Sequence, residues 1–172
     1  MKKSSPLIVA VSLLVAAGSV AAASDSATNS TSNQVKSYSQ LSSSTAFALA
    51  NSAVSQCAKA NYSVTATVVD LSGRVKAQLR NDNAGPHTLD SSRKKAFTAV
   101  SMKQPTANVM KTVAEKPILE PLKDMDDNLL FLAGGIPIKV NNQLVGAIGV
   151  GGAPGGHLDV ACAEEAIKTV LK

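Results

Sequence analysis

Residues 64–80, VTATVVDLSGRVKAQLR, predict a β-hairpin from which the rest of the fold can be inferred. Val64–Asp70 is rich in β-branched residues, which favour extended backbone. Asp70-Leu71-Ser72-Gly73 is typical of a tight turn, because Gly73 can adopt a positive φ. Arg74–Arg80 alternates apolar and polar side chains, as the returning strand of a hairpin does.

A second hairpin is predicted toward the C-terminus. Ile136–Val140 and Gln143–Val150 have the composition of strands, and Asn141-Asn142 between them is a favoured two-residue hairpin turn. Asn128–Ala133 is predicted as a further strand, which ends at a sharp break at Gly134-Gly135. Because strands joined by tight turns pair antiparallel, we expect an α/β (α+β) domain with an antiparallel sheet of about five strands.

Helices are predicted around these hairpins. Ser42-Ser43-Ser44 offers capping hydroxyls to the first helix, and Asp90 or a nearby serine lies near the start of the second. Pro105 allows a third helix to begin, and Pro117 and Pro121 bracket a short helical turn. The helices are expected over about 44–60, 89–102, 106–115 and from His157 or Leu158 to Leu171. They must cover at least one face of the sheet.

The N-terminus has the three parts of a cleavable export signal. Lys2 and Lys3 form a positive n-region, residues 7–17 are almost entirely apolar, and Ala21 and Ala23 fit the small-residue pattern before a cleavage site. We predict a cut after Ala23 and a periplasmic or secreted mature protein; the alternative is an uncleaved anchor. The apolar run is shorter than the roughly 20 residues that span a bilayer, so no membrane span is expected after cleavage.

The predicted organisation is a signal peptide (1–23), a flexible segment rich in Ser, Thr, Asn and Ala (24–40) and one domain (41–172). The net charge of +5 falls to +3 once Lys2 and Lys3 leave with the signal. There is no basic stripe interleaved with aromatic residues, so nucleic acid is not expected as a partner.

The two cysteines, Cys57 and Cys162, each lie on the apolar stripe of a predicted helix. An even number of cysteines in an oxidising compartment makes a disulfide between them plausible. The alternative is a pair of buried free thiols, which behave as small apolar side chains. The sequence does not decide between a disulfide and two free thiols.

The two histidines, His87 and His157, both lie beside glycine and proline where a loop meets a predicted helix. Neither has a second histidine or cysteine at ligand spacing, which argues against a structural zinc site. Haem iron needs only one protein ligand, because the porphyrin supplies four nitrogens, so one exposed histidine above an apolar pocket is sufficient. The alternative for each is a surface or capping role.

Other motifs carry weaker signals. The glycine-rich loop 149–156 lacks the lysine and the βαβ context of a phosphate-binding loop. No Gly-x-Ser-x-Gly motif of a hydrolase is present. The cluster Asp124, Asp126 and Asp127 is either a loose cation site or a solvated face. The basic run Arg93-Lys94-Lys95 is either a solvated helix face or a partner for carboxylates, including haem propionates, through charge-assisted hydrogen bonds.

An ordered set of segments resembles the HbpS/GlcG haem-binding (haem-degrading domain) family over about residues 41–172. The segments are Val68-Val69-Asp70-Leu71-Ser72-Gly73, Arg80-Asn81-Asp82, Lys95-Ala96-Phe97-Thr98-Ala99, Gly134-Gly135-Ile136-Pro137-Ile138 and Val145-Gly146-Ala147-Ile148-Gly149-Val150-Gly151-Gly152. The resemblance implies a profilin-like domain that assembles into homo-oligomers, of which an octamer is one form. It also implies binding of haem or, in relatives, of a corrinoid.

The resemblance places His87 and Thr88 in the family's ligand region, so His87 is the candidate axial ligand of haem iron. On this hypothesis Arg93 or Lys94 meets the haem propionates, and Phe97, Leu89 or Met102 meets the apolar face. Residues 89, 93 and 97 share one helix face.

Three functions are compatible with the sequence. The first is an exported haem-binding protein for capture, storage or sensing, working with a sensor or transport protein. The second is an enzyme that degrades haem, and the third is an oligomeric interaction module with no small ligand. The sequence does not decide whether the protein is an enzyme.

Overall fold

The hairpin predicted over residues 64–80 is present as strands β1 (Thr65–Val69) and β2 (Val75–Arg80), which pair antiparallel. The Asp70 carboxylate closes the turn by accepting hydrogen bonds from the backbone amides of Ser72 (2.8 Å) and Arg74 (3.0 Å). Gly73 has φ +75°, the left-handed conformation that the sequence predicted.

The computed structural model describes residues 36–172, and Tyr38–Lys172 forms one compact unit. The predicted signal peptide 1–23 and most of the predicted flexible segment 24–40 lie outside the described residues. Residues 36–40 have no regular structure and are exposed. Within the described residues, no helix is both long and apolar enough to cross a membrane.

The second hairpin consists of β3 (Gly135–Val140) and β4 (Gln143–Gly151), joined at Asn141 and Asn142 with φ values of 49° and 63°. Positive φ at both central residues is the signature of a type I′ turn. The four strands form one sheet in the order β2-β1-β4-β3, and each neighbouring pair is antiparallel. The antiparallel sheet is confirmed, with four strands in the described residues instead of about five.

The prediction of a strand over Asn128–Ala133 is wrong. The first three backbone amides of this segment donate elsewhere: Asn128 to the Asp126 carboxylate (2.7 Å), Leu129 to the Asp126 carbonyl (2.9 Å) and Leu130 to the Thr98 hydroxyl (2.8 Å). They are therefore not available to a neighbouring strand. Pairing begins only at Gly134, whose carbonyl accepts from the Val150 amide (2.9 Å).

All four predicted helices are present, as α1 (Ser43–Lys59), α2 (His87–Met102), α3 (Thr106–Glu115) and α4 (Gly156–Val170). The short helical turn between the prolines is a 3-10 helix, η1 (Pro117–Asp124). Ser42 caps α1 by accepting from the Thr45 amide, as the serine run predicted. Helix α2 begins two residues earlier than expected, at His87.

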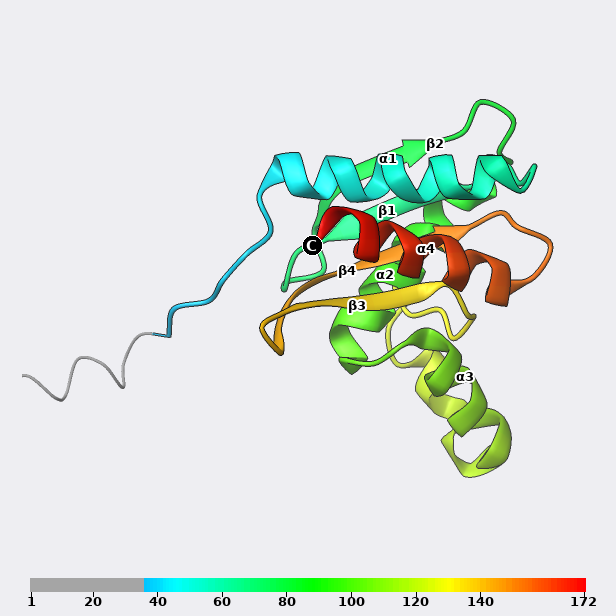
Figure 1. Ribbon diagram of the computed structural model, residues 1–172. Helices are drawn as coiled ribbons and strands as arrows, with labels where there is room; N and C mark the ends of the chain where they lie inside the picture. Colours follow the sequence, from blue (N-terminus) through cyan, green and yellow to red (C-terminus); the bar gives the residue numbers. More distant parts are fainter. Residues whose placement is uncertain (1–35) are drawn as a thin grey trace, which may run out of the picture. The chain divides into compact units, whose positions relative to one another are not determined.

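The helices cover both faces of the sheet (Figure 1). Helices α1 and α4 lie together on one face, and α2 lies across the other. Helix α3 and η1 extend from the end of α2 away from the sheet. The unit Tyr38–Lys172 therefore has three layers, with the sheet in the middle.

The larger core cluster lies between the sheet and helices α1 and α4. Its sheet residues are aliphatic and come from alternate positions of β1, β3 and β4: Ala66, Val68, Ile136, Ile138, Ile148 and Val150. Leu49 of α1 and Ala163 of α4 are fully buried against them. A disulfide between Cys57 and Cys162 joins the two helices inside this cluster, across 105 residues of sequence.

The face under α2 is built from small and polar residues. Gly149 on β4 lies so close to α2 that a Cβ there would overlap the Ser92 carbonyl oxygen and stand 2.5 Å from the Ala96 amide nitrogen. Two buried hydroxyl pairs join β1 to α2, Thr65 with Thr88 (2.6 Å) and Thr67 with Ser92 (2.7 Å). This face holds α2 by close backbone approach and hydrogen bonds, with a smaller apolar cluster.

Candidate functional site

An open cleft of about 700 Å³ lies where α2 and α4 begin. Its volume is within the range of small-molecule and cofactor sites. The apolar part of its lining comes from α3, the segment before β3, the glycine-rich loop and α4, through Ala107, Met110, Leu132, Ala133, Pro154 and Val160. The cleft therefore offers an apolar ligand contacts from four segments that are distant in sequence.

Helix α2 presents three polar side chains to the cleft, His87, Ser91 and Lys95. Residues four apart in an α-helix lie on the same face, so the three form one stripe. At 1.5 Å rise per residue the stripe extends over about 12 Å. His87 is exposed at the start of the helix, whereas Lys95 is buried two turns further on.

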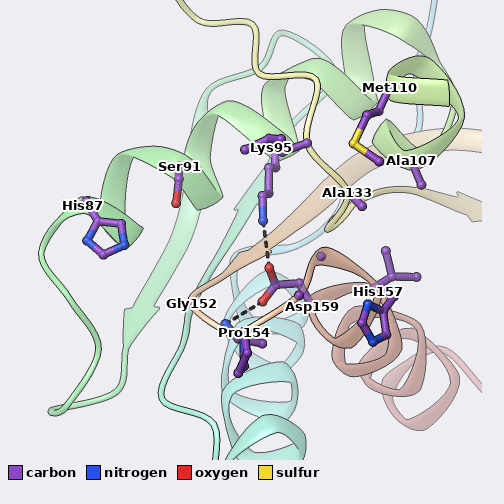
Figure 2. Close-up of a pocket in the computed structure, with 15 residues that line it drawn as sticks. His87, Ser91, Lys95, Ala107, Met110, Ala133, Gly152, Pro154, His157 and Asp159 are labelled. Atoms are coloured by element: carbon purple, nitrogen blue, oxygen red, sulfur yellow. Dashed lines mark hydrogen bonds and ion pairs between the residues drawn. The ribbon is translucent and has the colours of Figure 1, made fainter. Parts of the chain in front are cut away.

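Lys95 forms a buried ion pair with Asp159 of α4, with 2.8 Å between Nζ and Oδ2 (Figure 2). The same ammonium donates to the Val150 carbonyl at the end of β4 (2.9 Å). The other oxygen of Asp159 accepts from the Ala153 amide (3.1 Å). Burial raises the pKa of the Asp159 carboxyl, while Lys95 and the Ala153 amide oppose that rise. This network ties α2, β4, the glycine-rich loop and α4 together.

The second histidine, His157, also lines the cleft, from the first turn of α4. Figure 2 shows His87 and His157 on either side of the Lys95–Asp159 pair. Each imidazole lies against a glycine two residues earlier in the chain. A Cβ at Gly85 would stand 2.6 Å from the His87 ring, and one at Gly155 would stand 2.7 Å from the His157 ring.

Both helices that begin at the cleft lack a side-chain N-cap. Pro86 precedes α2 and Gly155 precedes α4, and neither makes a side-chain capping hydrogen bond. The first amides of a helix carry a partial positive charge and are satisfied by side chains, water or ligands. This partial positive charge borders the cleft at both helix starts, and the first turns also contain the acidic side chains Asp90 in α2 and Asp159 in α4.

Of the four cofactor-binding residues predicted from the sequence, only His87 lines this cleft. Thr88 is buried, and its hydroxyl contacts the Gly85 carbonyl (2.6 Å) as well as Thr65. Phe97 lies beside the β1–β2 turn, where a Cβ at Gly73 would stand 2.5 Å from its ring.

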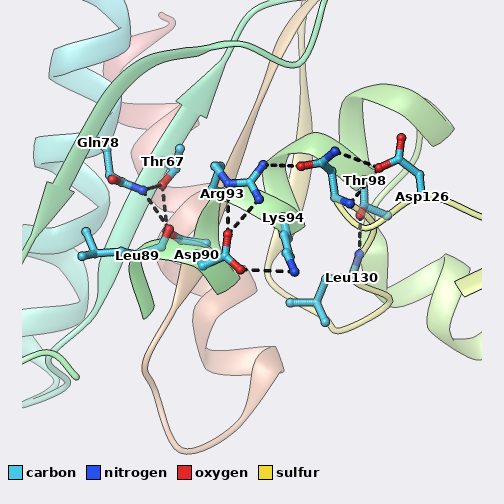
Figure 3. Close-up of polar contacts among 11 residues, drawn as sticks. Thr67, Gln78, Leu89, Asp90, Arg93, Lys94, Thr98, Asp126 and Leu130 are labelled. Atoms are coloured by element: carbon cyan, nitrogen blue, oxygen red, sulfur yellow. Dashed lines mark hydrogen bonds and ion pairs between the residues drawn. The ribbon is translucent and has the colours of Figure 1, made fainter. Parts of the chain in front are cut away.

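Arg93 lies on a different face of α2 from the stripe. Its guanidinium donates to Asp90 (2.7 Å) and to the Asn128 side chain (2.9 Å), and Lys94 pairs with the same Asp90 at 3.2 Å (Figure 3). The structure does not bring these two cations to His87. Their predicted contact with a ligand stays a prediction.

Sequence reasoning missed Ser91, Lys95 and His157 as members of one site. Residues four apart share one helix face, so His87, Ser91 and Lys95 form a stripe just as Leu89, Arg93 and Phe97 do. Counting in steps of four from His87 identifies the side of α2 that faces the cleft. His157 carried the same local signal as His87, a histidine beside glycine and proline at the start of a helix, but its proximity to the stripe depends on how α4 packs against the sheet.

The donor set suits haem better than a bare metal ion. In the described residues, no group of three or more His, Cys, Asp or Glu side chains is arranged to hold a metal ion. Haem iron needs only one protein ligand, and an exposed imidazole beside an apolar cleft meets that requirement. The cluster Asp124, Asp126 and Asp127 belongs to no such group, and Asp126 accepts hydrogen bonds from Asn128.

Comparison with known proteins connects this site to a family. The sequence model of the family described as "Haem degrading protein HbpS-like" matches residues 41–168. The protein GlcG of Escherichia coli strain K12 is 33% identical over 95 residues, which are 54% of this chain and 66% of GlcG. The chain thus spans just under two thirds of the length of the curated relatives it matches.

Two solved structures have the same fold. A double mutant of HbpS from Streptomyces reticuli is 34% identical, with a TM-score of 0.73 over 94% of this chain and 98% of that one. PduOC, whose structure is a complex with haem, is 25% identical, with a TM-score of 0.70 over 76% and 95%. Because the family match extends over most of the described residues, the chain belongs to the HbpS-like family.

Proposed function

We propose that this protein binds haem in the cleft where α2 and α4 begin, with His87 as the axial ligand of the iron. The observation that carries the proposal is the joint presence of an exposed imidazole and an apolar lining in one cleft of about 700 Å³. The relation to PduOC, which was solved with haem, supports the same ligand. When bound, haem would supply redox and oxygen chemistry at its iron.

The residues of the cleft suit the different parts of haem. Met110, Leu132 and Val160 can cover the apolar macrocycle, which loses water on binding. The uncapped starts of α2 and α4 favour the negatively charged edge of the molecule. Because His87 is exposed, it can reach a planar ligand without leaving its helix.

The test is a titration of purified protein with haemin, followed by its absorption spectrum. We expect a shifted, sharpened Soret band in the wild type and the loss of its ligated form in His87→Ala. A wild-type spectrum identical to free haemin would refute haem binding. If only His157→Ala lost the ligated spectrum, haem binding would stand and the assignment of His87 would be wrong. Competition with a corrinoid tests the alternative tetrapyrrole.

We propose further that the protein is exported and serves haem capture, storage or sensing at the cell boundary. The buried disulfide supports this role, since such bonds persist in oxidising compartments. Cell fractionation, with mass spectrometry of the mature N-terminus, tests it. A full-length protein that stays in the cytoplasmic fraction with reduced cysteines would contradict it. Native mass spectrometry of the same material tests the expected homo-oligomer, and co-purification tests a sensor or transport partner.

Haem degradation is the second candidate function, because the family description names that activity. A single axial imidazole leaves one coordination position of the iron free, which such a reaction needs. Incubation with haemin and ascorbate, following the Soret band and released iron, decides between the two. Loss of haem faster than in a protein-free control favours the enzyme, and an equal rate favours binding alone.

A further inference from the structure

The buried lysine of the cleft has a hydrogen-bonding group that the fold does not use. A lysine ammonium has three N–H donors. The Val150 carbonyl and the Asp159 carboxylate take two of those of Lys95, at 2.9 and 2.8 Å, and no third acceptor is found in the described part of the chain. Lys95 is only 5% exposed, yet it lines the cleft. Its remaining donor is therefore available to a ligand there.

Ser91 lies one helical turn before Lys95 and lines the same cleft. A Cβ built on Gly151 would stand 2.8 Å from the Ser91 hydroxyl and 3.7 Å from the Lys95 Nζ. The two polar groups thus border the same glycine of β4. A hydroxyl and an ammonium on adjacent turns form a donor pair that matches the two oxygens of a carboxylate.

The carboxylate of Asp159, which also lines the cleft, is already engaged within the fold. Both oxygens of that carboxylate accept hydrogen bonds, from Lys95 and from the Ala153 amide. The other charged or titratable side chains that line the cleft are the two histidines, and the starts of α2 and α4 add partial positive charge.

We propose that Ser91 and Lys95 form a carboxylate-binding subsite on the buried side of the cleft, which receives a propionate of the haem. This inference rests on the proposed function and adds the orientation of the ligand. Haem would lie along α2, with its iron toward His87 and a propionate toward Lys95, two helical turns further on. Lys95 would then have two roles, holding Asp159 in the fold and recognising the ligand.

The experiment compares the affinity of the protein for haemin with its affinity for haemin dimethyl ester, which lacks carboxylates. We expect the wild type to bind haemin about tenfold more tightly or better, the effect of a charge-assisted hydrogen bond. Ser91→Ala should lose part of this preference. The double variant Lys95→Met/Asp159→Asn should lose most of the preference for haemin. It removes both charges of the buried pair, so no buried carboxylate remains without a cation. The affinity for the ester should stay unchanged in both variants.

Two further variants complete the design. Ser101→Ala, on the exposed part of α2 and away from the cleft, is the matched control and should keep the full preference. Lys94→Met tests the neighbouring lysine, which pairs with Asp90 outside the cleft. If Lys94→Met lost the preference and the Lys95 variant kept it, the inference would be overturned.

The result separates this inference from the proposed function. Equal affinity of the wild type for haemin and its ester would refute the subsite and leave haem binding intact. The absence of haemin binding would refute both. A general loss of structure would weaken binding of both ligands equally, so a change in their affinity ratio reports the subsite itself.

Discussion

The two faces of the sheet hold their helices through different kinds of contact. Toward α1 and α4 the inner strands β1 and β4 present aliphatic side chains, such as Val68, Ile148 and Val150. Toward α2 the same strands present Thr65, Thr67 and Gly149, and α2 approaches the backbone itself. Alternate residues of one strand therefore serve two different kinds of contact.

The difference between the faces explains where the candidate site lies. Burial of apolar area on the α1/α4 face provides stability without requiring a particular polar geometry. The α2 face fixes one helix by specific hydrogen bonds, which places the stripe His87, Ser91 and Lys95 at a defined position. The Lys95–Asp159 pair then connects this face to α4, so that both helix ends border one cleft.

The largest expected effect concerns the covalent link of the apolar face. The double variant Cys57→Ala/Cys162→Ala should lower the free energy of unfolding by about 4 kcal/mol, since the disulfide restricts a long loop in the unfolded chain. Guanidinium denaturation of the oxidised protein measures it. Wild type with reductant should show a similar loss. A change below about 1 kcal/mol would mean that the link adds little to this layer.

The second prediction concerns the connection between the two faces. Lys95→Met should destabilise the protein by about 3 kcal/mol, because it leaves the Asp159 carboxylate buried without a cation. Lys95→Met/Asp159→Asn should recover most of the loss in urea denaturation. If the double variant were as unstable as the single one, the cost would come from packing instead of charge.

The third prediction contrasts the faces directly through two adjacent residues of β4. Gly149→Ala adds one carbon under α2 and should cost about 1–3 kcal/mol, because backbone atoms of the helix block it. Ile148→Val removes one carbon on the opposite face and should cost about 0.5–1.5 kcal/mol through lost packing. Thermal unfolding of both variants measures the contrast. A neutral Gly149→Ala would show that α2 does not depend on close approach.

The smallest expected effect lies on the outer side of α2. A hydrogen bond from Arg93 lowers the pKa of the Asp90 carboxyl. The charged form of Asp90 therefore stabilises the fold at pH values above the ordinary carboxyl pKa of 3.8. This contribution disappears as the pH falls through the lowered pKa. Asp90→Asn should cost under about 0.5 kcal/mol at neutral pH, as for exposed ion pairs. Stability curves of the two proteins should converge in acid. A constant difference across pH would contradict the electrostatic explanation.

Much of the fold could be predicted because local signals agreed with it. The Asp70–Gly73 and Asn141-Asn142 turns and the helix spacing each act within a few residues. Asn128–Ala133 was mispredicted because its strand-like composition was overridden by hydrogen bonds to Asp126, two residues before it, and to Thr98, which lies 32 residues from Leu130 and which no local pattern records.

The site was less predictable because it is formed by contacts between distant segments. The histidine at the start of α2 was identified through the family resemblance, but the partner of Lys95 lies 64 residues away on another helix. In the sequence there is one continuous basic run, Arg93-Lys94-Lys95. Its members point to different surroundings, and only the last reaches the cleft.

The most direct test of the central claim is a crystal structure of the protein with haemin, using anomalous scattering to locate the iron. We predict an iron peak in the cleft at bonding distance from the His87 imidazole, with a propionate beside Ser91 and Lys95. An iron peak away from the starts of α2 and α4, or none at full haemin loading, would contradict the account.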